Sequence, residues 1–497
     1  MYFPLSAPKE WARVSLVLAL VLSLARPLIA QPTDYFPYYS SDTTTVFKLA
    51  SDRKMAAKKM LAPPKGVSSD YKKDLNRFLG SASDHAFYSI RYSALLDSEI
   101  DPFVQQIYHD ILKANPGLPP TRLVVTRNPI PNASALLDGT ILFNVGLISR
   151  LENESQLAAV LCHELAHVVS RHVEKGIFSY LDRVHSKDFK KDLKAIEKEE
   201  FNTHDKLRKL IMGMSMNTLY HKRSHESQAD SLGYVLLTNT RFDASQAYTM
   251  LQLLDVVDEP YLKEGPAYAQ FFGCQHNTVA FGEQAKKTNS IFQVVKEENA
   301  LEKSDTLKTH PDCKKRMDYI QQLMAGRTVG ATQANDARFA HIKHLCRMET
   351  VQSWFDLQYY DYALFDALQL LQAQPNNGFL QSMVLLSLYE LKRYQLMHDY
   401  AQVVSNISEG NSDAFNRFLR TLHELQLSDI RNLSTCFTQL AAANLPENEY
   451  GTAARYARLA LVDEKAEADK AKADYLSRHK GGRFEKLIAP KPKTKRK

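Results

Sequence analysis

Cysteine is scarce in this sequence, and its few copies lie far apart. The five cysteines show no C-x-x-C spacing, so neither a cysteine zinc site nor a dense disulfide framework is predicted. Each is interpreted as a small buried side chain. Export into an oxidising compartment would allow one disulfide, without fixing which two cysteines pair. They are Cys162, Cys274, Cys313, Cys346 and Cys436.

Apolar runs long enough to span a bilayer are also missing. The most apolar segment, Val14 to Ala25, has 12 residues, whereas a membrane-spanning helix needs about 20. Lys9 and Arg13 precede it and the small Ala30 follows, which is the architecture of a signal peptide. We therefore expect residues 1–30 to be removed by cleavage near Ala30 and the protein to be exported to the periplasm or envelope. An uncleaved anchor is the alternative; otherwise any membrane association would be peripheral.

A large excess of one charge is absent as well. Of the net charge of +7, the last seven residues supply five charges, which leaves +2 for the rest of the chain. This balance gives no indication of a nucleic-acid-binding surface, and no nucleic acid partner is expected. Residues 479–497 are interpreted as a basic tail that ends in solvated disorder rather than in a segment that binds a membrane or a polyanion.

One strongly apolar run, AAVLCHELAHVVSRH at residues 158–172, carries two histidines four positions apart. On a helix His163 and His167 share a face, and Glu164 lies beside it. Two buried imidazoles and a carboxylate cost several kcal/mol unless something compensates them, and a metal ion would do so. The alternative is an ordinary buried helix that happens to contain two histidines.

A third ligand stands in the later segment RSHESQADSLGYVLL, residues 223–237. Glu226 and Asp230 share a helical face, so Glu226 would complete a His2Glu zinc site and Asp230 would orient a ligand histidine. For this pair alone a solvated acidic face is the better interpretation, but the H-E-x-x-H motif reverses that order. His225 is a rival ligand, although neighbours on a helix point about 100° apart.

Together with NASALLDGTILFNVGLI at residues 132–148, these motifs resemble the zinc metallopeptidase family that contains the HtpX heat-shock proteases, the CAAX-prenyl proteases, and mitochondrial and periplasmic quality-control proteases of the barrel-assembly-enhancing type. The resemblance covers residues 68–325. It implies that His163, His167 and Glu226 bind one Zn²⁺ and that Glu164 is the general base.

A further segment, THPDCKKRM at residues 309–317, resembles the end of the same family's domain. It makes His310 a catalytic candidate that would reach the open zinc position, either displacing the attacking water or donating to the oxyanion. A turn-capping role is the alternative. The chain departs from the family pattern around E-x-x-x-D, where Ser227 and Gln228 stand at positions at which a further acidic residue is common. The remaining histidines of the intervening charged segment are assigned to a solvated helical insertion; they are His172, His185, His204 and His221.

The expected fold is mainly α, with an α+β protease domain and an all-α helical repeat domain. Residues 132–144 predict a strand, an Asp138-Gly139 turn and a strand beside the motif helix, where an extended substrate would add as a strand. Residues 31–67, which lack steady periodicity, are assigned to an extended lead-in.

Residues 337–478 predict helix upon helix with features of tetratricopeptide repeats. Tyr360 and Ala363 fit the second helix of such a repeat, and Tyr394 follows Tyr360 by 34 residues. Tyr450 and Ala453 repeat the pattern. Stacked helix pairs would expose a concave surface for a partner. An irregular helical bundle is the alternative, because the usual Trp and Gly positions are mostly absent.

These features together predict an exported zinc-dependent endopeptidase of the gluzincin type. Its expected substrates are unfolded, misfolded or misassembled envelope proteins, and the helical repeats would contact the envelope assembly machinery. The competing hypothesis is a chaperone or binding protein of the tetratricopeptide type that retains a zinc site but has little proteolytic activity.

Overall fold

The computed structural model describes most of the chain, with several gaps. Contacts divide the chain into Met1–Phe36 and Pro37–Lys497, and only residues 35 and 36 of the first unit are described. Everything that follows concerns the second unit. The described residues are 35–37, 43–97, 99–197, 223–256, 265–277, 279, 313–325, 337–408, 411–442 and 445–489.

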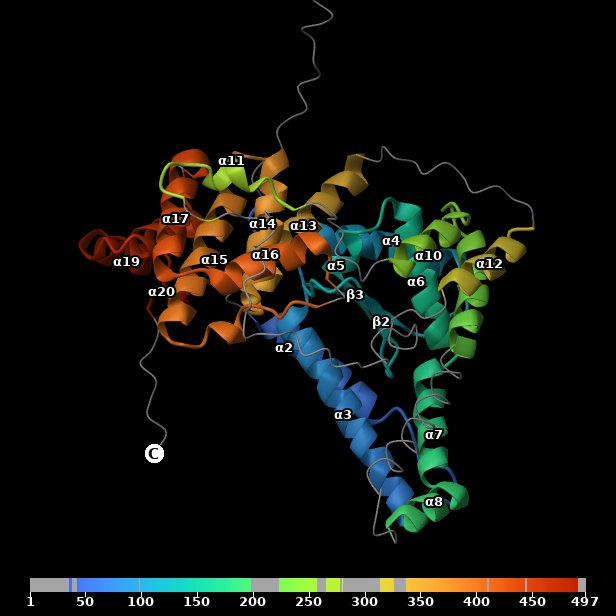
Figure 1. Ribbon diagram of the computed structural model, residues 1–497. Helices are drawn as coiled ribbons and strands as arrows, with labels where there is room; N and C mark the ends of the chain where they lie inside the picture. The colour runs from blue at the N-terminus through green and yellow to red at the C-terminus, as the bar shows by residue number, and fades with distance from the viewer. Residues whose placement is uncertain are drawn as a thin grey trace, which may run out of the picture. The chain divides into compact units, whose positions relative to one another are not determined.

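The second unit begins with two long helices, α2 (Thr44–Lys58) and α3 (Ser69–Ser93), which lie side by side (Figure 1). The expectation of an extended lead-in over residues 31–67 is therefore wrong for Thr44–Lys58. Its buried face consists of Ala50 and Ala57, whose small side chains let α2 approach α3 closely. Two alanines make only a weak apolar stripe, which explains why this segment shows no clear helical periodicity in its sequence.

A three-stranded sheet follows the helix α4 (Ile100–Ala114). Its order is β1-β3-β2, with β3 parallel to β1 and antiparallel to β2. The predicted strand, turn and strand over residues 132–144 are confirmed, and Gly139 takes the positive φ of 79° that the turn requires. Strand β2 packs against the motif helix. The strands are β1 (Arg122–Thr126), β2 (Ala133–Ala135) and β3 (Thr140–Asn144).

The helices around the predicted site come next along the chain. The short α5 (Val145–Ile148) leads into α6 (Glu154–Val169), which carries the H-E-x-x-H motif. A helix whose described part spans residues 223–238 carries E-x-x-x-D. Helix α10 packs against both α6 and α12. The other helices of this region are α7 (His172–Val184), α8 (Lys187–Glu197), α10 (Gln246–Asp255) and α12 (Cys313–Leu323).

Residues 337–488 form a helical region, which confirms the predicted all-α character. The residues that suggested the repeats are all buried; they are Tyr360, Ala363, Tyr450 and Ala453. Helix α15, however, packs on α18, which is not its neighbour in the sequence, as well as on α14. The tetratricopeptide pattern stays a prediction. The elements are α13 (Ala337–Asp356), α14 (Tyr360–Ala373), α15 (Gly378–Leu396), η1 (Tyr400–Gln402), α16 (Asp413–Glu424), α17 (Leu427–Ala441), α18 (Glu449–Leu461), α19 (Lys465–Arg478) and α20 (Glu485–Ile488).

The beginning of the predicted basic tail is folded. Phe484 and Ile488 are buried, and Arg483 pairs with Asp356 of α13 at 2.8 Å. The boundary at residue 479 is therefore too early, because two apolar side chains anchor this stretch to the helical region. The charged end, residues 491–497, lies outside the described residues.

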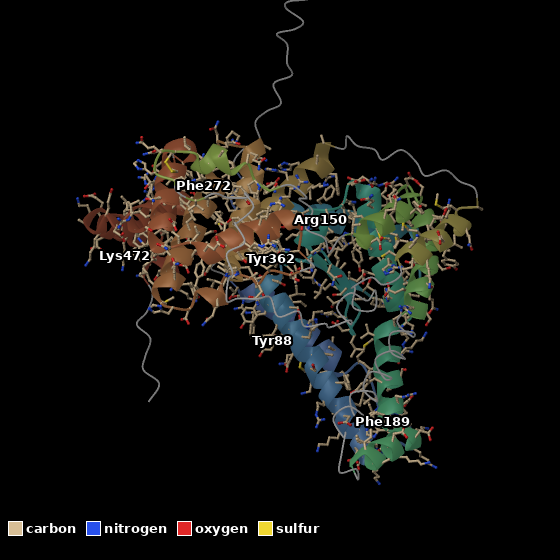
Figure 2. All side chains as sticks on the ribbon, viewed as in Figure 1. Tyr88, Arg150, Phe189, Phe272, Tyr362 and Lys472 are labelled. Atoms are coloured by element: carbon tan, nitrogen blue, oxygen red, sulfur yellow. A yellow bond between two sulfur atoms is a disulfide. The ribbon has the colours of Figure 1, made fainter. Side chains whose placement is uncertain are left out.

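A disulfide and a short helix join the two regions. The helix α11 (Tyr268–Phe272) packs on α17, and Cys274 forms a disulfide with Cys436 of that helix. Phe272 lies among the side chains of the helical region (Figure 2) and contacts Phe437. Cys162, Cys313 and Cys346 are buried, as expected. The helix α13 completes the contact by packing on α4 and α5.

None of the described helices combines the length and hydrophobicity needed to cross a bilayer. The apolar segment at residues 14–25 is not among the residues described.

Asp366 of α14 provides a test of this packing through pH. Burial raises its pKa to about 7 from 3.8, against the opposing effects of Arg150 and of a hydrogen bond from Trp354. The folded state thus binds more protons than the unfolded state between these two values, so its free energy of unfolding falls as pH rises through this window. Above pH 7 the ionised carboxylate costs on the order of a few kcal/mol.

We predict that Asp366→Asn raises the melting temperature by several degrees at pH 8 and by clearly less at pH 5, because only the part of this window between 3.8 and 5 has then been crossed. Thermal unfolding followed by circular dichroism at both pH values measures this difference. Asp469→Asn, which removes an exposed acid of α19, is the control. An equal effect of Asp366→Asn at both pH values would contradict the prediction.

Candidate active site

Helix α6 places the H-E-x-x-H motif in the interior of the protein. Asn153 caps the helix by accepting a hydrogen bond from the Gln156 backbone N–H at 2.8 Å. The apolar residues that follow are buried, and so are His163 and Glu164, which are 3% and 4% exposed. The interpretation of these histidines as unpartnered core residues fails, because polar groups from other helices surround them.

The three predicted zinc ligands converge. One potential ligand atom each from His163, His167 and Glu226 lies within 4.8 Å of the others. The two Nε2 atoms are 3.0 Å apart, and the Glu226 carboxylate oxygens lie 3.5 Å from the first and 3.6 Å from the second. Two imidazoles and one carboxylate are a donor set that Zn²⁺ favours, so the residues fit this metal.

A buried arginine balances the carboxylates of the site. Arg316 of α12 donates from Nε and Nη2 to Asp230, both at 2.7 Å, and its Nη1 lies 3.0 Å from Glu226. Asp230 in turn lies 3.1 Å from Nδ1 of His163. Burial opposes ionisation of both carboxyl groups, but Arg316 and His163 outweigh it and hold the pKa values of Glu226 and Asp230 below their ordinary range.

The two candidate ligand histidines have different environments. Burial disfavours the charged form of His163, but the neighbouring Asp230 and Glu226 outweigh it and raise its pKa to about 9. Burial and the charge of His163 lower the pKa of His167 to about 2. A proton on His163 and a metal ion compete for the same nitrogen, so metal binding would release this proton.

Glu164 lies beside the ligand cluster and faces the sheet. Burial raises its pKa to about 7, while His163 and a hydrogen bond with the backbone of Ala135 in β2 act in the opposite direction. A nearby divalent cation would lower this value, because it stabilises the carboxylate. A carboxyl group in this range can accept and return a proton near neutral pH.

His172, assigned from the sequence to a solvated insertion, is buried at the site instead. Its Nδ1 lies 2.9 Å from Nδ1 of His167, and its Nε2 lies 3.0 Å from Oε1 of Gln228. The ring of His225 stacks on it at 4.2 Å, which places this rival ligand outside the cluster. The sequence does not indicate this position, because His172 stands among charged residues. Only the turn between α6 and α7 returns it to the site.

The other predicted residues are distributed as follows. His185, at the end of α7, pairs with Asp74 at 3.0 Å, away from the ligands. His204, His221 and His310 lie outside the described residues, so the catalytic role of His310 stays a prediction. The ion-pairing role of Arg316 is not predicted from the sequence. Its segment draws attention through His310, and no sequence pattern pairs an arginine with an acid 86 positions earlier.

Gly233 sets the distance between the two helices of the site. A Cβ atom at this position would lie 3.0 Å from the His163 Cα and 3.1 Å from its backbone nitrogen. These are contacts with backbone, which moves less readily than a side chain. A side chain here must therefore shift helix 223–238, which carries Glu226 and Asp230.

We predict that Gly233→Ala weakens zinc binding by about tenfold or more, because it separates Glu226 from the two histidines. Competition with a chromophoric chelator measures this loss. Gly176→Ala on α7 is the control: its Cβ would have no neighbour within 4 Å, and we expect unchanged zinc affinity with a gain in stability of about 0.5–1 kcal/mol. Wild-type affinity in Gly233→Ala would refute the role of this close approach.

Comparisons with known proteins agree with this geometry. Residues 99–324 match the model of peptidase family M48. The chain is 29% identical over 136 residues to the mitochondrial metalloendopeptidase OMA1 of Schizosaccharomyces pombe, which is 27% of this chain and 38% of that protein. It is 26% identical over 153 residues to the putative beta-barrel assembly-enhancing protease of Vibrio cholerae, 30% of this chain and 31% of that protein.

A third relative is the protease HtpX homolog of Pelotomaculum thermopropionicum, 35% identical over 106 residues, which are 20% of this chain and 37% of that protein. The matches span less than two fifths of the length of each of these three relatives. They confirm the resemblance to a family of zinc metallopeptidases. Residues 99–324 of the chain are therefore similar to peptidase family M48.

Proposed function

We propose that the protein is a zinc-dependent metalloendopeptidase. The observation that carries this proposal is the convergence of His163 Nε2, His167 Nε2 and the Glu226 carboxylate beside the buried Glu164. A purely structural cluster would not need a carboxyl group whose pKa is raised to about 7 next to three metal-binding side chains. The family match and the relatives named as proteases support the same conclusion.

His163, His167 and Glu226 would hold one zinc ion. When bound, this ion supplies a polarised water and stabilises the negative charge that develops on the scissile carbonyl oxygen. Glu164 takes the proton of the water and later passes it to the leaving amine. Asp230 fixes the orientation of His163 through Nδ1, and Arg316 keeps Asp230 ionised.

Strand β2 supplies a surface for an extended substrate. It is the outer strand of the described sheet, paired with β3 on one side and packed against α6. The backbone of Ala133–Ala135 can therefore pair with a substrate strand that passes Glu164. Backbone pairing makes few demands on substrate side chains, which suits cleavage of unfolded or misfolded chains.

The proposed setting is the periplasm or envelope, with misfolded or misassembled envelope proteins as substrates. The signal-peptide pattern supports export, and the Cys274–Cys436 disulfide suits an oxidising compartment. Relatives named beta-barrel assembly-enhancing protease support an envelope role, in which the helical region would contact assembly machinery.

For export, we predict that the mature chain begins near Gln31. N-terminal sequencing of protein recovered from the envelope fraction measures this directly. Recovery of a chain that still begins with Met1 would contradict cleavage and support the uncleaved anchor.

For the chemistry, we predict that Glu164→Gln keeps zinc and loses casein hydrolysis, because the amide cannot accept the proton of the water. His163→Ala, His167→Ala and Glu226→Ala should each lose zinc as well as activity. Elemental analysis and a casein assay on the same preparations separate the two effects. Wild-type zinc content in Glu226→Ala would exclude Glu226 as the third ligand.

The same variants distinguish the second candidate function, a chaperone or binding protein that retains the zinc site. The helical region, which extends from α13 to α20, favours this candidate because it is large enough to hold a client. Protection of an aggregating client by wild type and Glu164→Gln alike, without hydrolysis by either, would support it. Hydrolysis by wild type alone would exclude it as the main function.

A further inference from the structure

Both ligand histidines direct Nε2 toward the ligand cluster and Nδ1 away from it, but their outer partners differ. His163 Nδ1 faces the carboxylate of Asp230 at 3.1 Å. His167 Nδ1 faces another imidazole nitrogen, Nδ1 of His172, at 2.9 Å. The opposite nitrogen of His172 lies 3.0 Å from the amide oxygen of Gln228. A chain of polar contacts therefore runs from His167 through His172 to Gln228.

The positions of the protons in this chain follow from its ends. A metal at Nε2 of His167 requires the lone pair there, so Nδ1 of His167 carries the proton and donates it. His172 must then accept at Nδ1 and carry its own proton on Nε2. The Gln228 oxygen, as an acceptor, completes the chain. The reverse order would place the proton of His167 on Nε2, where it blocks metal binding.

We propose that His172 is a positioning residue that, with Gln228, holds His167 in the tautomer able to bind zinc. This inference rests on the proposed zinc site. In this inference the neutral imidazole of His172 orients His167, as the carboxylate of Asp230 orients His163.

The local backbone is built to bring His172 back to His167. On a continuous helix, residues five apart point about 140° away from each other. Helix α6 ends at Val169, and Arg171 takes a left-handed conformation with φ 55° and ψ 40° before α7 begins at His172. A non-glycine residue in this region costs free energy and marks a turn that the surroundings enforce.

Packing fixes the ring of His172 in place. The side chain is buried, with only 4% of the residue exposed. The His225 ring stacks on it, with 7° between the planes. The ring therefore has two roles to separate by experiment: filling the space beneath His225 and accepting the hydrogen bond from His167.

Two substitutions of His172 separate these roles. His172→Phe keeps a ring that can stack on His225 but removes the acceptor. His172→Asn loses the ring, whereas its Oδ1 stands at the same bond separation from the backbone as Nδ1 and can accept from His167. A structural role predicts that Phe is tolerated better than Asn; the proposed role predicts the opposite order.

The measurement is the zinc dissociation constant, obtained by chelator competition on the full chain with the Glu164→Gln substitution, which prevents self-cleavage. We expect His172→Phe to raise the dissociation constant about 10- to 100-fold and His172→Asn to stay within about threefold of the parent. His185→Phe is the matched control: this histidine lies at the other end of α7 and pairs with Asp74. It should leave zinc affinity unchanged.

Thermal unfolding without metal checks that each variant folds. If His172→Phe does not fold, Gln228→Met at the exposed end of the chain of contacts decides, with an expected loss of zinc affinity of about threefold to tenfold. Parent-like affinity in His172→Phe would overturn the inference, and so would equal losses in the Phe and Asn variants. If His172→Phe does not fold, parent-like affinity in Gln228→Met would overturn it. Failure of the parent itself to bind zinc would refute the proposed function instead.

Discussion

The bidentate contact between Arg316 and Asp230 holds the site together, because two buried carboxylates, one buried imidazole and one half-buried imidazole cannot remain close without a cation. Arg316 also reaches Glu226, so one guanidinium contacts both acids of the E-x-x-x-D motif. The arginine comes from α12 and the acids from helix 223–238, while the histidines come from α6. The site therefore forms only when these three helices are packed, and folding and metal binding depend on the same contacts.

The helical region is tied to this assembly through the chain itself. In the sequence, the short helix α11 lies between α10 and α12, which pack against each other near the site. It is anchored to α17 by Phe271, Phe272 and the Cys274–Cys436 disulfide. The family match at residues 99–324 therefore includes a segment that is buried against the helical region. The helix that delivers Arg316 follows this anchored segment, and contacts place both regions in one compact unit, Pro37–Lys497.

The sequence predicts those parts of the site that local periodicity controls. The pairs His163/His167 and Glu226/Asp230 each depend only on the helical repeat, and the Asp138-Gly139 turn depends only on local backbone preference. Arg316 and Gly233 act across tertiary contacts that no spacing rule contains, and His172 lies beyond a left-handed turn that breaks the helical period. The helix α2 was missed because it buries alanines, which leave hardly any hydrophobic pattern.

Charge balance explains why the two proposed ligand histidines have different outer partners. Three carboxylates, those of Glu164, Glu226 and Asp230, lie in the buried site with one guanidinium. A divalent ion and the Arg316 guanidinium together would carry as much positive charge as the three carboxylates carry negative charge. A second orienting carboxylate in place of His172 would leave the metal-loaded site with a net negative charge in a medium where unbalanced charge is costly. A neutral imidazole that passes the hydrogen bond on to Gln228 orients His167 without adding that charge. The site thus uses a carboxylate where Arg316 neutralises it and a neutral acceptor beside His167.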